Sequence, residues 1–117
     1  MAAVLVVEDD PGVRNLVVLV LKQKGYDVLS ASNGVEGLMV YTSYHSRVDL
    51  VLTDVDMPQM NGLELANRIR ASDPSKKILI MTGGLSDDVN GCLACPILSK
   101  PFAPNQLLEA VEGILKT

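Results

Sequence analysis

Short apolar runs and stretches with helical periodicity alternate along the sequence, and only short connections separate them. The first run, at residues 3–7, is apolar throughout, which is typical of a strand buried on both faces. Such strands lie in parallel sheets, because the helices that connect them cover both faces of the sheet. The predicted strands cover residues 3–7, 27–31, 49–53, 77–81 and 97–98. We therefore expect an α/β fold with a five-stranded parallel sheet between two helical layers.

The predicted helices have recognisable ends. Asp10 and Pro11 are typical of the first residues of a helix, and Gly25 is typical of the position just after its end. Between residues 85 and 95 few apolar residues recur at helical spacing, so we expect the fourth helix to be short. The other helices are predicted after Asn33, from Gly62 to Asp73 and from Pro104 to Leu115.

The size and charge of the chain narrow the classes of function. At 117 residues it is long enough for a buried core, and we expect a single domain over residues 1–117. A net charge of −4 without a cluster of Lys and Arg argues against nucleic-acid binding by this domain alone. No apolar run approaches the roughly 18 residues that a membrane span needs. Two cysteines and no export signal predict a cytoplasmic protein.

Polar residues follow four of the predicted strands at the point where each strand ends. They are Glu8 and Asp9 after the first strand, Asp54 after the third, Thr82 after the fourth and Lys100 after the fifth. In an open parallel sheet these ends lie at one edge, which is the usual location of a binding site. If the first and third strands are neighbours, the three acids share one pocket, which requires bound protons or a cation. Mg²⁺ or Mn²⁺ suits such oxygen ligands.

The charges of these residues indicate a chemistry. Three carboxylates, one divalent cation and the ammonium group of Lys100 add up to zero. Such a site can accept a phosphoryl group, because the cation and the ammonium group take up the charge on its oxygens. Asp54 would be the nucleophile, since carboxylates form aspartyl-phosphates, and the hydroxyl of Thr82 would donate to a phosphoryl oxygen.

Four motifs occur in the order found in the bacterial response-regulator family, and the sequence resembles chemotaxis-type receiver domains over its whole length. The motifs are Val6-Val7-Glu8-Asp9-Asp10-Pro11, Asp54-Val55-Asp56-Met57-Pro58-Gln59-Met60-Asn61-Gly62, Ile80-Met81-Thr82-Gly83 and Lys100-Pro101-Phe102. The resemblance implies a flavodoxin-like, doubly wound sheet with strand order 2-1-3-4-5. It also implies a phosphoacceptor of a two-component system or phosphorelay, with a histidine kinase or histidine phosphotransfer protein as partner.

The resemblance further implies a role for each site residue. Asp54 would be phosphorylated, and Thr82 and Lys100 would contact the phosphoryl group. Four residues would hold Mg²⁺: Glu8, Asp9, Asp54 and, through its backbone carbonyl, Asp56. A cis peptide bond between Lys100 and Pro101 is implied as well, since X-Pro bonds are the ones that readily become cis. Such a domain autocatalyses its own phosphorylation and dephosphorylation, but it is not a turnover enzyme.

Two features depart from the family pattern. Ile97 occupies a position at which many members carry an aromatic residue that couples to the threonine. The segment between Thr82 and Lys100 is shorter than is usual, so the surface around the fourth helix should be altered. The way in which such members transmit their signal therefore does not carry over to this sequence.

Two other functions fit part of the pattern. A receiver-like adaptor that acts without phosphorylation is favoured by Ile97 and by the short fourth helix. A phosphatase of the haloacid-dehalogenase type also has a nucleophile two residues before a second acid, as in Asp54 and Asp56. Its metal-binding acid pair comes last in the sequence, however, whereas Glu8 and Asp9 come first here. The cognate kinase, the output and the presence of further domains are left open by the sequence.

Overall fold

The computed structural model describes residues 2–83 and 95–116. Within these residues the strands are β1 (Ala3–Val7), β2 (Asp27–Ala31), β3 (Leu50–Asp54), β4 (Lys77–Thr82) and β5 (Ile97–Ser99). The helices are α1 (Pro11–Lys24), α2 (Gly34–Tyr44), α3 (Gly62–Ser72) and α4 (Pro104–Leu115). The short helix that the sequence predicts between residues 85 and 95 falls on a segment outside the described residues.

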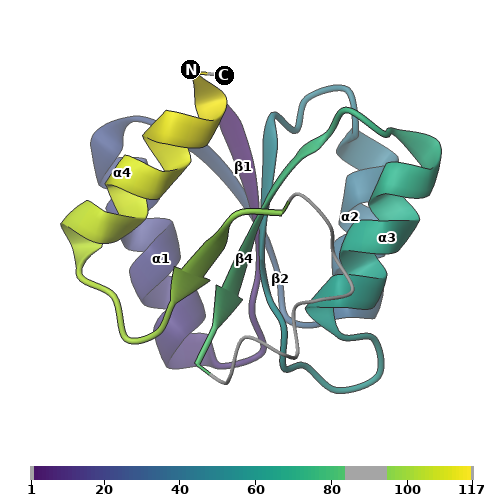
Figure 1. Ribbon diagram of the computed structural model, residues 1–117, viewed down its shortest axis with the longest axis horizontal. Coiled ribbons are helices and arrows are strands. Elements are labelled where there is room, and N and C mark those ends of the chain that lie inside the picture. Colours follow the sequence, from purple (N-terminus) through teal and green to yellow (C-terminus); the bar gives the residue numbers. More distant parts are fainter. Residues whose placement is uncertain (1, 84–94, 117) are drawn as a thin grey trace.

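All five strands are parallel and lie in the order β2-β1-β3-β4-β5. Helices α1 and α4 cover one face of the sheet, and α2 and α3 cover the other (Figure 1). The predicted flavodoxin-like, doubly wound sheet and its strand order are confirmed. Because every strand points the same way, all carboxyl ends meet at one edge of the sheet.

Side chains of the central strands alternate between two apolar layers. In β1, Val4 and Val6 pack in the layer beneath α1 and α4, whereas Leu5 and Val7 pack in the layer beneath α2 and α3. All four side chains are fully buried. Burial on both faces explains why this strand is apolar throughout instead of alternating with polar residues.

Strand β3 begins and ends one residue later than the sequence predicts. Asp49 lies just before the strand, and its carboxylate accepts a hydrogen bond from the backbone N–H of Ala3 at 2.8 Å. At the other end, Asp54 is still in register with Met81 of β4. Strands β4 and β5 also run one residue further than predicted. Pairing with the neighbouring strand therefore sets these ends, and the phosphoacceptor candidate is part of the rigid sheet.

Local hydrogen bonds explain where the helices begin and end. The side chain of Asp10 caps α1 by accepting from the backbone N–H of Gly12 at 2.8 Å, and Gly25 closes the helix in a left-handed conformation with φ of 103°. Ala103 has no side-chain acceptor for the start of α4. Instead, the side chain of Gln106 accepts from the backbone N–H of Ala103 at 2.7 Å.

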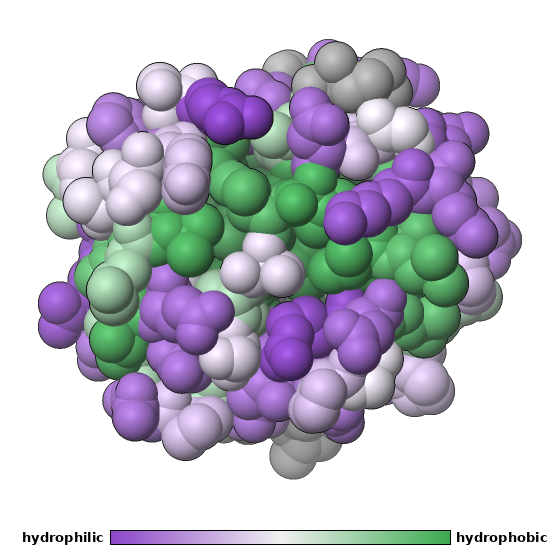
Figure 2. Space-filling view, turned by 180° about the vertical axis from the view of Figure 1, so that it is seen from behind, coloured by the Kyte–Doolittle hydropathy of each residue, from purple (hydrophilic) through white to green (hydrophobic). Residues whose placement is uncertain are grey.

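The surface seen from behind carries a band of hydrophobic residues between polar margins (Figure 2). Helices α1 and α2 lie toward this side (Figure 1). Five of the exposed large hydrophobic side chains belong to these two helices: Leu16, Leu19, Val35, Met39 and Tyr44. None of the helices in the described part of the chain has the length and apolar character needed to cross a membrane.

Candidate functional site

The predicted site residues meet at the carboxyl edge of the sheet. Strands β1 and β3 are neighbours, and Val7 is in register with Thr53, so that Glu8 and Asp54 come next on the two adjoining chains. Glu8 is fully buried, Asp54 is 4% exposed, and Asp9 is exposed. The sequence-based expectation that the acids share one pocket therefore agrees with the strand order.

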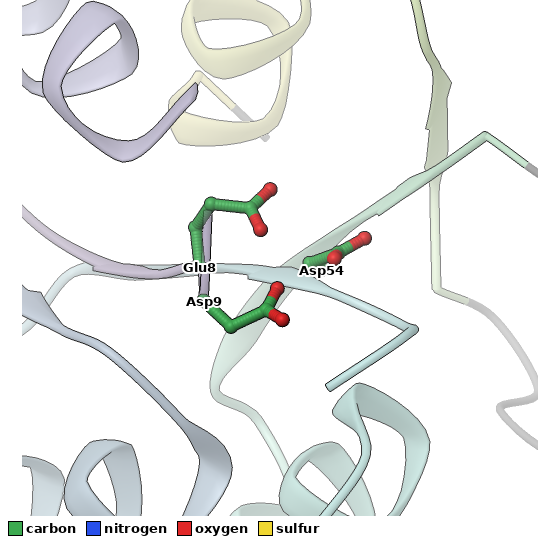
Figure 3. A group of neighbouring side chains, drawn as sticks. All are labelled: Glu8, Asp9 and Asp54. Atoms are coloured by element: carbon green, nitrogen blue, oxygen red, sulfur yellow. The ribbon is translucent and has the colours of Figure 1, made fainter. Parts of the chain in front are cut away.

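Three carboxylates converge at this edge. Glu8, Asp9 and Asp54 each place an oxygen within 4.8 Å of the oxygens of the other two. The carboxylates of Glu8 and Asp9 project from the end of β1 toward the side on which Asp54 lies (Figure 3). Oxygen atoms with this charge and spacing are a donor set for a hard divalent cation. The cluster is therefore a candidate metal site.

Lys100 supplies the positive charge next to the acids. Its Nζ lies 2.6 Å from Oε1 of Glu8 and 3.2 Å from Oδ1 of Asp54, and its side chain is 23% exposed. The backbone N–H of Lys100 donates to the carbonyl of Thr82 at 2.7 Å, which ties the end of β5 to the end of β4. The peptide bond between Lys100 and Pro101 is cis, as predicted. Thr82 is 4% exposed at the same edge.

Burial dominates the acid–base properties of these groups. It raises the pKa of Glu8 to about 7, although the hydrogen bond from Lys100 opposes the shift. Burial also raises the pKa of Asp54, again against the charge of Lys100. The pKa of Lys100 is raised, because Glu8 and Asp54 more than offset the lowering by burial. The acids thus hold more charge than one ammonium group stabilises, and a cation would favour their ionised forms.

The loop after β3 is packed closely against the site. The backbone N–H of Gly62 donates to the carbonyl of Val55 at 3.0 Å. A Cβ atom at Gly62 would lie only 2.0 Å from the carbonyl oxygen of Asp54, so only glycine fits there. Asp56 lies in this loop with an exposed side chain, two residues beyond Asp54.

Two contacts to Glu8 were not expected from the sequence. The backbone N–H of Asp10 donates to Oε2 of Glu8 at 3.2 Å, and Nη1 of Arg14 donates to the backbone carbonyl of Glu8 at 2.8 Å. Asp10 belongs to the motif Val6-Val7-Glu8-Asp9-Asp10-Pro11, but Arg14 lies outside it. The available signal was a cation one helical turn after the N-cap, where the side chain can point back toward the strand.

An apolar recess adjoins the site on the side of α1. It has a volume of about 440 Å³ and is lined by Val13, Leu16, Gly83, Lys100, Pro101 and Phe102. Lys100 therefore faces the acids with its ammonium group and also lines this recess. A larger cavity of about 520 Å³ lies among residues such as Ala2, Asp49 and Lys77 at the amino ends of the strands. It is at the opposite edge of the sheet from the acids.

Comparison with known proteins gives a consistent match. The family model described as response regulator receiver domain matches residues 4–112. The response regulator receiver protein CpdR of Brucella abortus is 35% identical over 124 residues, which cover 98% of each chain. The transcriptional regulatory protein GlrR of Escherichia coli is 34% identical, and the match covers 98% of this chain but only 26% of GlrR. The structure of the response regulator protein TrrA of Thermotoga maritima in complex with Mg²⁺-BeF has a TM-score of 0.89 and 33% identity, covering 97% of this chain and 99% of TrrA.

Proposed function

The chain belongs to the response regulator receiver domain family of two-component signalling, and we propose that Asp54 is its phosphoacceptor. The observation that carries this proposal is the position of the Asp54 carboxylate, which ends the central strand β3 and lies within reach of two acids and one lysine. Its relatives are signalling proteins and not turnover enzymes. One phosphorylation per molecule, catalysed by the receiver itself, is therefore the expected reaction.

We assign the cation site to the acidic cluster. Glu8, Asp9 and Asp54 supply carboxylate oxygens, and we propose the backbone carbonyl of Asp56 as the fourth ligand. The fit is chemical: these are hard oxygen donors, and burial makes the charge of Glu8 and Asp54 costly without a counter-ion. Mg²⁺ is the proposed ion, in line with the Mg²⁺-BeF complex of TrrA, and Mn²⁺ should substitute. When bound, the cation would neutralise charge on the transferring phosphoryl group.

The protein residues have distinct parts in the proposed transfer. An oxygen of Asp54 forms a bond to phosphorus while the bond from phosphorus to the donor nitrogen breaks, and the imidazole of the donor leaves. Lys100 can then exchange its contact with Asp54 for a phosphoryl oxygen, since its Nζ already lies 3.2 Å from that carboxylate. The hydroxyl of Thr82 is the proposed donor to a second phosphoryl oxygen.

The proposed donor is a phosphohistidine on a histidine kinase or histidine phosphotransfer protein. The apolar recess beside Lys100 offers a surface next to the site on which such a protein could rest. For a domain with this role we also propose a cytoplasmic location. The chain spans about a quarter of GlrR but nearly all of CpdR, so relatives carry this domain with and without additional segments. We therefore propose no output for the whole protein.

A phosphorylation-independent adaptor is the second candidate. Ile97 is 45% exposed at the sheet edge, where it stands in place of the aromatic residue of many receivers. The phosphatase alternative loses its support, because the whole pattern of motifs matches the receiver family over residues 4–112. A partner that binds equally well with and without phosphorylation would favour the adaptor.

The test is chemical labelling with a small acyl-phosphate donor in the presence of Mg²⁺. The wild-type protein should incorporate one acid-labile phosphoryl group per molecule, whereas Asp54→Asn should incorporate none. Asp49→Asn is the matched control, because Asp49 lies just before the other end of the same strand. Equal labelling of the wild type and Asp54→Asn would refute the assignment.

A further inference from the structure

Arg14 reaches back from α1 to the acidic end of β1. Its Nη1 donates to the backbone carbonyl of Glu8 at 2.8 Å, and the side chain is half-buried. Its backbone N–H donates to the carbonyl of Asp10 at 2.9 Å, in the first turn of the helix. The guanidinium group therefore joins a rigid helix to the peptide unit that links Glu8 with Asp9.

Glu8 is held by a different part of the chain at each of its polar groups. Its N–H donates to the carbonyl of Ala31, and its carboxylate accepts from Lys100 and from the N–H of Asp10. The backbone carbonyl is the remaining group, and Arg14 provides its contact. The hydrogen bond from Arg14 thus completes the set that immobilises the end of β1.

The orientation of the Glu8 carbonyl determines the position of the backbone nitrogen of Asp9. A peptide unit is planar, so fixing the carbonyl of Glu8 also fixes the positions of the nitrogen and the Cα atom of Asp9, from which its side chain leaves the backbone. Asp9 is exposed, in contrast to Glu8 and Asp54, which the protein interior surrounds. Its carboxylate nevertheless lies within 4.8 Å of the other two. We propose that Arg14 is a positioning residue, which orients Asp9 for binding of the divalent cation.

The proposal rests on the metal-binding role of the acidic cluster, and it predicts whether replacing Arg14 weakens or strengthens cation binding. Removing the guanidinium group would loosen Asp9 and weaken cation binding, but it would also remove a nearby positive charge and strengthen cation binding. Groups that orient metal ligands typically change metal affinity by about tenfold or more when they are replaced. We expect the loss of orientation to dominate.

The experiment is a calorimetric titration of the metal-free protein with MgCl₂. Arg14→Met should bind Mg²⁺ about tenfold more weakly than the wild type. Arg14→Lys, which keeps the charge and a donor for the carbonyl, should restore most of the affinity. In phosphorylation assays the Mg²⁺ concentration for half-maximal rate should rise similarly in Arg14→Met, while the rate at saturating Mg²⁺ stays unchanged. A general loss of folding would lower that rate as well.

Arg47→Met is the matched control. Arg47 follows α2 at the opposite edge of the sheet, where its guanidinium group lies 5.9 Å from the centre of the Tyr44 ring. The variant Arg47→Met loses the same charge as Arg14→Met at a position away from the site, and its Mg²⁺ affinity should equal that of the wild type. Unchanged or tighter binding by Arg14→Met would overturn the proposal. A wild type that binds no Mg²⁺ would instead refute the proposed function, so the two failures can be told apart.

Discussion

The Nζ atom of Lys100 lies 2.6 Å from the carboxylate of Glu8, which is fully buried. These residues are far apart in sequence, at the ends of β5 and β1, and the same Nζ also lies 3.2 Å from Asp54. Burial still outweighs the lysine, because the pKa of Glu8 is raised to about 7. Keeping Glu8 ionised beside Lys100 therefore lowers the stability of the folded protein, and unfolding experiments can measure this effect.

Replacing Lys100 by Met should destabilise the protein, because Glu8 loses the ion that compensates its buried charge. Removing one partner of a buried ion pair typically lowers the free energy of unfolding by about 3 to 5 kcal/mol. The double variant Glu8→Gln, Lys100→Met should recover most of this loss, since it removes the unpaired charge. Urea unfolding at pH 8 measures both. A double variant as unstable as Lys100→Met would show that the packing of the lysine stem, and not its charge, stabilises the fold.

The raised pKa of Glu8 predicts a dependence of stability on pH. The pKa in the folded protein, about 7, exceeds the ordinary value of 4.5. The contribution of Glu8 to the free energy of unfolding is therefore fully present below pH 4.5 and is lost as the pH rises through 7. In EDTA, as the pH rises over this range, the free energy of unfolding of the wild type should fall by on the order of 3 kcal/mol relative to that of Glu8→Gln. Unfolding measured in both proteins from pH 4.5 to 8 tests the difference, and parallel curves would contradict it.

Addition of Mg²⁺ should stabilise the folded protein. A ligand that binds only the folded state at a concentration of about 100 times its dissociation constant contributes about 2.7 kcal/mol. Asp9→Asn should be more stable than the wild type in EDTA, because one negative charge leaves the cluster, and it should gain less from Mg²⁺. Thermal unfolding with EDTA and with MgCl₂ gives both values. Equal gains in the wild type and in Asp9→Asn would exclude Asp9 as a ligand.

Gly62→Ala should disturb the site through the backbone. The added Cβ would lie 2.0 Å from the carbonyl oxygen of Asp54, and relieving this overlap should cost about 3 kcal/mol and reduce phosphorylation. Gly113→Ala is the control, because a Cβ there meets nothing within 4 Å and the residue lies inside α4. That variant should gain about 0.5 to 1 kcal/mol. Similar effects of the two substitutions in urea unfolding would contradict the role of the close approach.

The strand pattern was sufficient to predict the parallel sheet, and the resemblance to receiver domains supplied the strand order that makes the acids neighbours. Continuous apolar strands separated by helices leave few arrangements, and parallel strands bring Glu8, Asp54 and Lys100 to one edge. Strand ends were displaced by one residue, because pairing partners decide them: Asp54 continues β3 alongside Met81, which no local pattern encodes.

The contact from Arg14 to Glu8 could not be predicted from spacing alone. Helical periodicity says which face of α1 carries Arg14, but it does not say whether the side chain extends into water or folds back on the strand. The pKa of Glu8 is a similar case, since burial in the assembled fold causes most of its shift. Both features depend on tertiary packing.

The central claim is that the phosphoryl group is carried by Asp54, and reductive trapping locates it most directly. Borohydride reduces an acyl phosphate on an aspartate side chain to homoserine, which peptide mass spectrometry identifies by position. After incubation with a small acyl-phosphate donor and Mg²⁺, we expect homoserine at position 54 alone, and none when EDTA replaces Mg²⁺. Homoserine at Asp9 or Asp56 with none at Asp54 would contradict the account.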